Sequence, residues 1–374
     1  SFNIDFSKRI TDKSNFSYGT EYIHNKVRSK ARSQSVASNA LGIIASRFPD
    51  QSKWETMAAY LSHKYKPNTS LTVQSGIRYN YVTIDADLTA NNSFYIPPFV
   101  NASLETSAIT GNLGFSWNPD SNIIWKLNTT TAFRAPNIDD IGKLFDSQNG
   151  IVVVPNRNLK PEYAYSIELG LSIKFLEDIA LDFSAYYTHL KDALARKPFT
   201  VNGQTQILYD NELSEIYAIQ NASKSRIYGF EAGIKVRFSD EFKLTSQYSY
   251  VYGVQEDTSG IELPVRHVAP SFGNTHLIWK RNNLQLDGFI SYNGTLGSSD
   301  ISNELANYLF ALDSDGNPYA PSWYTLNARA RFDLNSSVSF VGTLENITNQ
   351  RYRTYSSGIT SPGTNFIAAI TYKF

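Results

Sequence analysis

The sequence contains no cysteine and only one methionine among its 374 residues. The absence of cysteine excludes disulfide bonds, thiolate metal sites and thiol-based catalysis. Charge of either sign is not in excess, because 34 lysines and arginines balance 34 aspartates and glutamates. A neutral chain has no electrostatic attraction to nucleic acid. We therefore expect no nucleic-acid partner.

Long apolar runs are also missing. No run reaches the roughly 18 residues that a membrane-spanning helix requires, and the mean hydropathy of −0.32 is typical of a soluble protein. A membrane β-barrel has similar values, because every second residue of its strands faces water. The chain opens Ser1-Phe-Asn-Ile-Asp-Phe, without the basic and apolar segments of a secretory signal. An outer-membrane protein is made with such a signal, so we expect a processed or partial chain.

Aromatic residues, in contrast, are abundant. They make up 14% of the chain and include 24 tyrosines, as expected of the aromatic girdles at the two surfaces of a membrane barrel. At the C-terminus, Phe366, Ala368, Ile370, Tyr372 and Phe374 share one face of a strand, and more polar residues share the other. A soluble sandwich does not require a terminal aromatic residue. This segment therefore predicts the closing strand of an outer-membrane β-barrel.

The same alternation recurs along the chain in segments of about ten residues or more, the length of tilted membrane strands. Examples are residues 16–28, 71–87, 179–191, 242–252 and 284–294. Tight turns and long polar connections alternate between the segments, as in barrels with short periplasmic turns and long outer loops. The long connections are 29–55, 89–106, 134–161, 192–223, 253–265, 295–320 and 349–363. We predict an all-β fold, a transmembrane antiparallel β-barrel.

The strand count suggests that this barrel is incomplete. We count about fifteen strands, whereas single-chain bacterial barrels have an even number. The first strand, 2–9, precedes a short turn and so would begin at the outer surface. We expect residues 1–374 to be the C-terminal part of one barrel domain of about 22 strands. The alternative is one miscounted strand, with 193–199, 206–209 and 216–220 forming an extra hairpin above the membrane.

Several motifs resemble those of the TonB-dependent outer-membrane receptors of Gram-negative bacteria. They are Phe133-Arg-Ala-Pro136, the segment 155–162 (PNRNLKPE), 225–231 (SRIYGFE), 263–270 (LPVRHVAP) and the tail 344–374. The resemblance implies an N-terminal plug, absent here together with the first strands, and contact with outer-membrane lipid and the TonB energy-transducing complex. It further implies active import of a scarce nutrient ligand, with a ferric siderophore or haem expected first. No cofactor, resident metal or enzymatic activity is implied.

The resemblance and the strand register together give two sets of candidate residues. Candidates for substrate binding lie in the outer loops and at the rim: Arg134, Asn137, Asp139, Asp140, His189, Arg351, Tyr352 and Tyr355. Candidates for facing the plug lie on the luminal side of strands: Arg78, Glu168, Glu231, Arg329 and Arg331. For Glu168 and Glu231 we favour an alternative role, pairing with the inward cations Lys174, Lys235, Arg237 or Arg331.

The substrate and the mode of transport stay open at this point. Haem receptors of this family carry a histidine between two boxes, Phe-Arg-Ala-Pro and Asn-Pro-Asn/Asp-Leu, as a plausible iron ligand. Here the second box is reduced to Asn156-Arg-Asn-Leu159, and no histidine precedes it in the connection. This weakens the haem hypothesis. Two rival functions remain: a passive porin without a plug, and a barrel that serves as a structural or assembly subunit of an outer-membrane complex.

Overall fold

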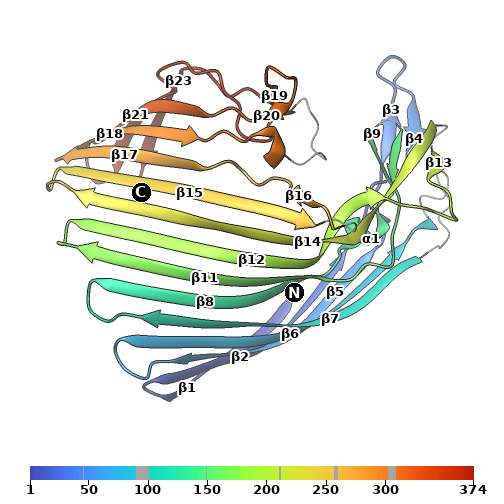
Figure 1. Cartoon of the computed structure of the whole chain (residues 1–374), viewed down its shortest axis with the longest axis horizontal. Helices are drawn as coiled ribbons and strands as arrows, with labels where there is room; N and C mark the ends of the chain where they lie inside the picture. The colour runs from blue at the N-terminus through green and yellow to red at the C-terminus, as the bar shows by residue number, and fades with distance from the viewer. Residues whose placement is uncertain (45, 90–100, 149, 210–211, 257–259, 302–308) are drawn as a thin grey trace.

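The computed structural model describes residues 1–44, 46–89, 101–148, 150–209, 212–256, 260–301 and 309–374. Fifteen strands of eight residues or more run antiparallel to one another in these residues (Figure 1). They are β1 (Phe2–Thr11), β2 (Ser14–Lys26), β5 (Lys53–Tyr65), β6 (Leu71–Asp87), β7 (Asn101–Trp117), β8 (Ile123–Arg134), β11 (Glu162–Phe175), β12 (Ile179–Pro198), β14 (Glu212–Arg237), β15 (Phe242–Glu256), β17 (Phe272–Arg281), β18 (Leu284–Asn293), β21 (Trp323–Asp333), β22 (Val338–Glu345) and β23 (Asn365–Tyr372).

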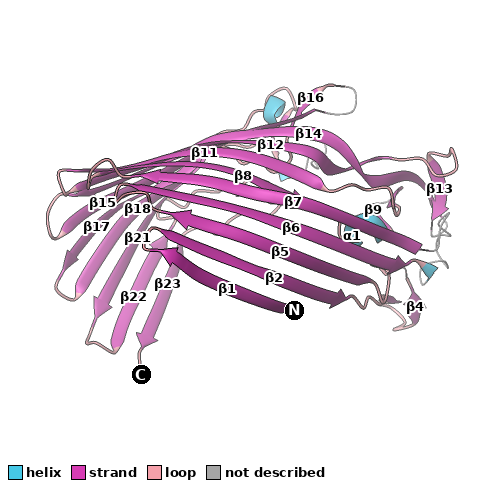
Figure 2. Cartoon of the chain, turned by 90° about the horizontal axis from the view of Figure 1, so that it is seen from below, coloured by secondary structure: helices cyan, strands magenta, loops and turns pink. Residues whose placement is uncertain are grey.

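Each of these strands pairs with the next one in the chain, so the fifteen form one continuous curved sheet (Figures 1 and 2). Within the described residues, β1 pairs only with β2, and β23 pairs only with β22. Because they are the first and fifteenth members of an antiparallel series, the two edge strands run in the same direction. The predicted all-β fold and the count of about fifteen strands are confirmed.

Short turns join the strands at one end of the sheet, and the remaining elements gather at the other (Figure 1). These elements are β3 (Arg32–Gln34), β4 (Leu41–Ile43), α1 (Ile138–Gly142), β9 (Phe145–Gln148), β10 (Ile151–Val153), β13 (Gln206–Tyr209), β16 (Glu262–Pro264), η2 (Ser298–Asp300), β19 (Ala311–Leu312) and β20 (Pro318–Tyr319). The predicted alternation of short and long connections is therefore confirmed. Among the described helices, none has the length and apolar character to cross a membrane.

The predicted long connection 192–223 is the largest departure from the predicted boundaries. Within it, strands β12 and β14 stay paired as far as Pro198 and Tyr217, with register shifts between Leu190 and Leu194. Strand β13 pairs with the first residues of β14, so the alternative hairpin exists as an extension of strands already counted. Water reaches this region, so paired strands there do not require the apolar face by which the sequence predicts membrane strands.

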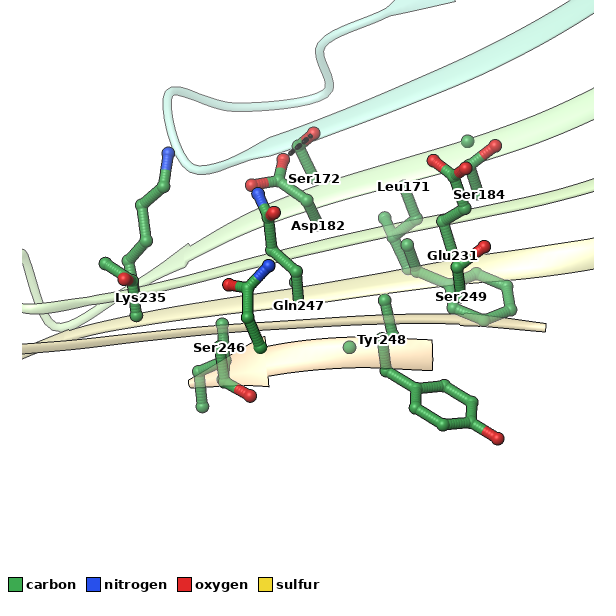
Figure 3. A pocket seen from close by; sticks show the side chains of 18 of the residues that line it. Leu171, Ser172, Asp182, Ser184, Glu231, Lys235, Ser246, Gln247, Tyr248 and Ser249 are labelled. Atoms are coloured by element: carbon green, nitrogen blue, oxygen red, sulfur yellow. Dashed lines mark hydrogen bonds between the residues drawn. The ribbon is translucent and has the colours of Figure 1, made fainter. Parts of the chain in front are cut away.

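The two faces of the sheet differ in polarity along each strand. On β15 and its neighbours, Gln247, Glu231 and Asp182 point to one side, and Tyr248 points to the other (Figure 3). The apolar face leaves large side chains exposed, including Phe366, which is 69% exposed, and Ile370, which is 71% exposed. Exposed apolar side chains on one face are the expected lining for lipid. We call the opposite, polar face the luminal face.

Gly229 is one of the glycines at which strands of the luminal face pack closely. Gly229 on β14 lies opposite Tyr186 on β12, and a Cβ there would lie 2.8 Å from the Tyr186 hydroxyl and 2.3 Å from the Tyr250 carbonyl oxygen.

We predict that Gly229→Ala destabilises the sheet by about 1–3 kcal/mol, because overpacking forces neighbouring atoms to shift. The measurement is the temperature at which the folded barrel loses its altered mobility in a denaturing gel. Gly288→Ala is the matched control, since no atom lies within 4 Å of its added Cβ; equal melting of the two variants would contradict the prediction.

Candidate functional site

Helix α1 lies at the end of the sheet that carries the long connections. We call α1, with Arg134 before it and the described residues that follow it up to Pro161, the platform. Asn137 caps the helix by accepting a hydrogen bond from the Asp140 amide at 3.0 Å, and the Asp140 carboxylate accepts one from the Asn137 amide at 2.9 Å. This capping box satisfies two amides that a helix start otherwise leaves without partners. Ile138 and Ile141 are buried and pack with apolar residues of β6, such as Ile84.

Ion pairs fix the platform to two other segments of the chain. Arg134 bridges the carboxylates of Asp140, at 2.6 Å, and Glu162. Asp139 receives Nε of Arg47 at 3.2 Å and Nζ of Lys143 at 3.0 Å. Burial alone would raise the pKa of Asp139, but hydrogen bonds from Arg47 and Lys143 outweigh that effect and hold the pKa below its ordinary value of 3.8.

The second sequence box also serves to hold the platform. The Asn156 side-chain amide donates to the Ile219 carbonyl at 2.7 Å. Asn221 on β14 accepts from the Lys160 amide at 2.7 Å and donates to the carbonyls of Lys160 and Asp192, both at 2.8 Å. Because these bonds satisfy backbone groups outside the regular ladder, they fix the connection between β10 and β11 onto the strand extension.

A separate cavity lies between the last two long connections, with a volume of about 420 Å³. The predicted residues Arg351, Tyr352 and Tyr355 all line it. Trp323 and Tyr352 place their ring centroids 4.3 Å apart, and Phe310 lies 6.0 Å from Tyr355. Burial raises the pKa of Tyr355. The cavity therefore combines aromatic walls with a guanidinium, and none of its described lining residues belongs to the platform.

The five predicted luminal residues lie on the polar face as expected from the strand register. Three are basic and have partners within the sheet. Arg78 pairs with Glu21, Arg331 lies 2.8 Å from Asp333, and Arg329 lies 5.5 Å over the Phe289 ring. These contacts give the luminal face a fixed pattern of charge.

The pairing that we favoured for Glu168 and Glu231 is wrong. Glu168 accepts a hydrogen bond from the Ser184 hydroxyl at 3.2 Å, and within the described residues neither carboxylate forms an ion pair. The proposed partner Arg237 pairs instead with Asp178 in the nearby turn. A second proposed partner, Arg331, pairs with Asp333 on its own strand. Both glutamates border a luminal pocket of about 420 Å³ with Asp182 and Lys235.

Comparison with known proteins identifies the fold family. A family model described as the TonB dependent receptor-like β-barrel matches residues 1–347. The chain belongs to the TonB-dependent receptor family. It therefore has the fold of an outer-membrane β-barrel, and the predicted resemblance and location are confirmed.

Three similar proteins show the breadth of this receptor family. The chain is 24% identical over 168 residues to an iron-regulated outer membrane virulence protein of Vibrio cholerae, covering 44% of the chain and 25% of that protein. It is 24% identical over 323 residues to the vitamin B12 transporter BtuB of Vibrio vulnificus, covering 85% and 44%. The solved structure of the copper transporter OprC covers the whole chain with a TM-score of 0.79 at 12% identity, and the match spans 56% of OprC.

Of the predicted binding residues of this receptor chain, His189 points in the wrong direction. On β12 it has the same parity as Phe183 and Tyr187, which are exposed on the apolar face, and it pairs with Tyr165 of β11. The register shift begins only after Leu190, so His189 stays on the lipid side. The sequence already contained this parity. A position near the rim does not change the face of the strand on which His189 lies.

Some residues that hold the platform or line the cavity were not among the candidates predicted from the sequence. Arg47 and Asn221 tie the receptor's platform together across 92 and 61 residues of sequence, respectively. Phe310 and Trp323 complete the cavity around Arg351. None of these residues lies in one of the sequence motifs. Each makes a contact that forms only when connections distant in sequence meet, and a local pattern does not predict such contacts.

We predict that Arg134→Ala loosens the platform. The change removes the cation that the largely buried carboxylates of Asp140 and Glu162 share. An unpaired buried carboxylate destabilises the folded segment around it. Backbone amides of residues 137–142 should exchange hydrogen about tenfold faster or more, as measured by mass spectrometry. The control is Arg237→Ala, which breaks an exposed ion pair at the other end of the sheet. Unchanged exchange in Arg134→Ala would refute this role.

Acidification should release the link between Arg47 and Asp139. Because the pKa of Asp139 is lowered in the folded state, its stabilising contribution is present above pH 3.8 and is lost as the pH falls through the lower folded value. Hydrogen exchange of residues 137–142 should therefore show constant stability from pH 7 to about 4, after correction for intrinsic rates, and a loss below. Asp139→Asn should show weaker protection at pH 7 without that acid-dependent step.

Proposed function

We propose that this chain is the barrel part of a receptor that imports a ferric siderophore or haem across the outer membrane with energy supplied through TonB. The observation that carries the proposal is the family match over residues 1–347, together with a luminal face and long connections of the expected kind. Members of the family are receptors and transporters, so the proposed activity is transport without chemical change of the substrate.

The iron chelate is favoured over other nutrients by two observations. A relative from Vibrio cholerae is named as iron-regulated. The cavity at Arg351 is aromatic and contains a guanidinium, which suits an anionic chelate or the carboxylates of haem. The vitamin B12 transporter among the relatives makes cobalamin the natural comparison substrate.

The partners follow from the same mechanism. We propose that an N-terminal plug, on the same polypeptide or a separate chain, contacts the luminal face at Arg78, Glu168, Glu231, Arg329 and Arg331. Glu168 and Glu231 suit this role because neither has an ion-pair partner among the described residues, and a charged lumen favours a partner of complementary charge. The TonB complex would act through that plug, while the apolar face contacts outer-membrane lipid.

Uptake measurements test this function. We predict that deleting the gene for the complete receptor abolishes TonB-dependent uptake of one radiolabelled iron source, ferric siderophore or haem, and that the gene on a plasmid restores it. Collapsing the inner-membrane proton gradient should have the same effect as the deletion. Cobalamin uptake serves as the comparison.

Each rival predicts a different result. Uptake that persists without TonB or the proton gradient would support a passive porin. Unchanged uptake of iron, haem and cobalamin in the deletion strain, with a defect in another envelope complex, would support a structural subunit. Either result would overturn the import proposal.

A further inference from the structure

The cavity between the last two long connections is held open by a built framework. Asn346 donates to the carbonyls of Gln350 and Pro362, at 2.8 and 3.1 Å, and its side-chain oxygen accepts from the Gln350 amide at 2.9 Å. The Asn346 amide in turn donates to Asn327 on β21 at 2.8 Å. These bonds fix both ends of the connection that carries Arg351 and Tyr355. A preformed cavity loses less entropy when a ligand binds.

The walls of the cavity come from separate parts of the chain. Trp323 begins β21, Phe310 lies in the connection before it, and Tyr352 and Tyr355 lie in the connection after β22. The Trp323–Tyr352 and Phe310–Tyr355 ring pairs brace the two connections against each other. Aromatic faces arranged in this way offer a stacking surface for a planar ligand, in addition to the contact among themselves.

The charged side chains in the described lining of the cavity are basic. Arg351 and Arg353 line it, and no aspartate or glutamate is among its described lining residues. The nearby Asp313 carboxylate is occupied by its own turn, where it accepts from the amides of Asp315 and Asn317 at 2.9 and 2.8 Å. Arg351 itself makes no ion pair in the described part of the chain. A guanidinium without a carboxylate partner next to aromatic faces favours an anionic, planar group.

The volume limits what fits. About 420 Å³ lies near the lower end of the range of roughly 300–1,000 Å³ for small-molecule pockets. A cavity of this size accommodates one substituted aromatic ring more readily than a complete metal chelate. The remainder of a larger ligand would extend out of the cavity toward water.

We propose that this cavity binds one negatively charged aromatic arm of the transported chelate, a catecholate or aryl carboxylate. Arg351 supplies the charge partner, and Trp323 and Tyr352 supply the stacking faces. The inference rests on the proposed import function and narrows its substrate class. It distinguishes aryl chelates from hydroxamate chelates, which have neither the ring nor the localised negative charge.

Binding to the purified full-length receptor in detergent tests the inference. The probe is the ferric complex of 2,3-dihydroxybenzoate, titrated by calorimetry, and ferric acetohydroxamate is the comparison without an aromatic ring. We predict that the receptor binds the aryl complex more tightly. Arg351→Ala should raise its Kd about 10- to 100-fold, because the variant loses a hydrogen bond between charged groups.

Matched variants separate binding from folding. Arg351→Lys keeps the charge and should recover part of the affinity, and Trp323→Phe should bind more tightly than Trp323→Ala because it keeps a ring. Arg281→Ala, at an exposed arginine that ends β17, should leave the Kd unchanged. Wild-type affinity in Arg351→Ala, or equal affinity for the two ferric complexes, would overturn the inference.

Uptake measurements on the same variants keep the two proposals apart. TonB-dependent iron uptake that Arg351→Ala leaves unaffected would refute the aryl site and retain the import function. Arg351-dependent binding of the aryl complex without any uptake would retain the site and refute import.

Discussion

The structure depends on the requirement that backbone amides and carbonyls within a bilayer find partners inside the protein. From β2 to β22 the long strands meet it through one antiparallel ladder, in which each strand pairs with a neighbour on both sides. Once the ladder fixes the register, the parity of each residue decides whether it contacts lipid or lumen. The exposed apolar side chains and the polar luminal pocket follow from this single constraint, as does the orientation of His189 toward lipid.

Beyond the bilayer that constraint weakens, and different interactions organise the chain. Strands β12 and β14 continue, but their side chains no longer alternate strictly between apolar and polar. Capping, ion pairs and asparagine side chains satisfy the irregular backbone around α1. Arg134 of the Phe133-Arg-Ala-Pro136 box thereby acquires a structural role, as does Asn137 directly after the box, because both are engaged within the platform. Their predicted role in substrate binding stays a prediction.

The candidate binding residues thus divide by location. Arg134, Asn137, Asp139 and Asp140 belong to the platform, whereas Arg351, Tyr352 and Tyr355 line the aromatic cavity. We predicted these residues as a single set in the outer loops and at the rim, and the structure separates them into two places. The expected pairing of Glu168 and Glu231 with inward cations is not present among the described residues, where Arg237 pairs with Asp178 and Arg331 with Asp333.

The sequence by itself determined the strands, their order, their two faces and the alternation of short and long connections. These features depend on local periodicity and on turn residues, which a linear reading captures. Only the tertiary structure decided which connections meet, as in the contact of Arg47 with Asp139 or of Phe310 with Tyr355. Such contacts join residues far apart in sequence, and they depend on the curvature of the complete sheet, which no local pattern specifies.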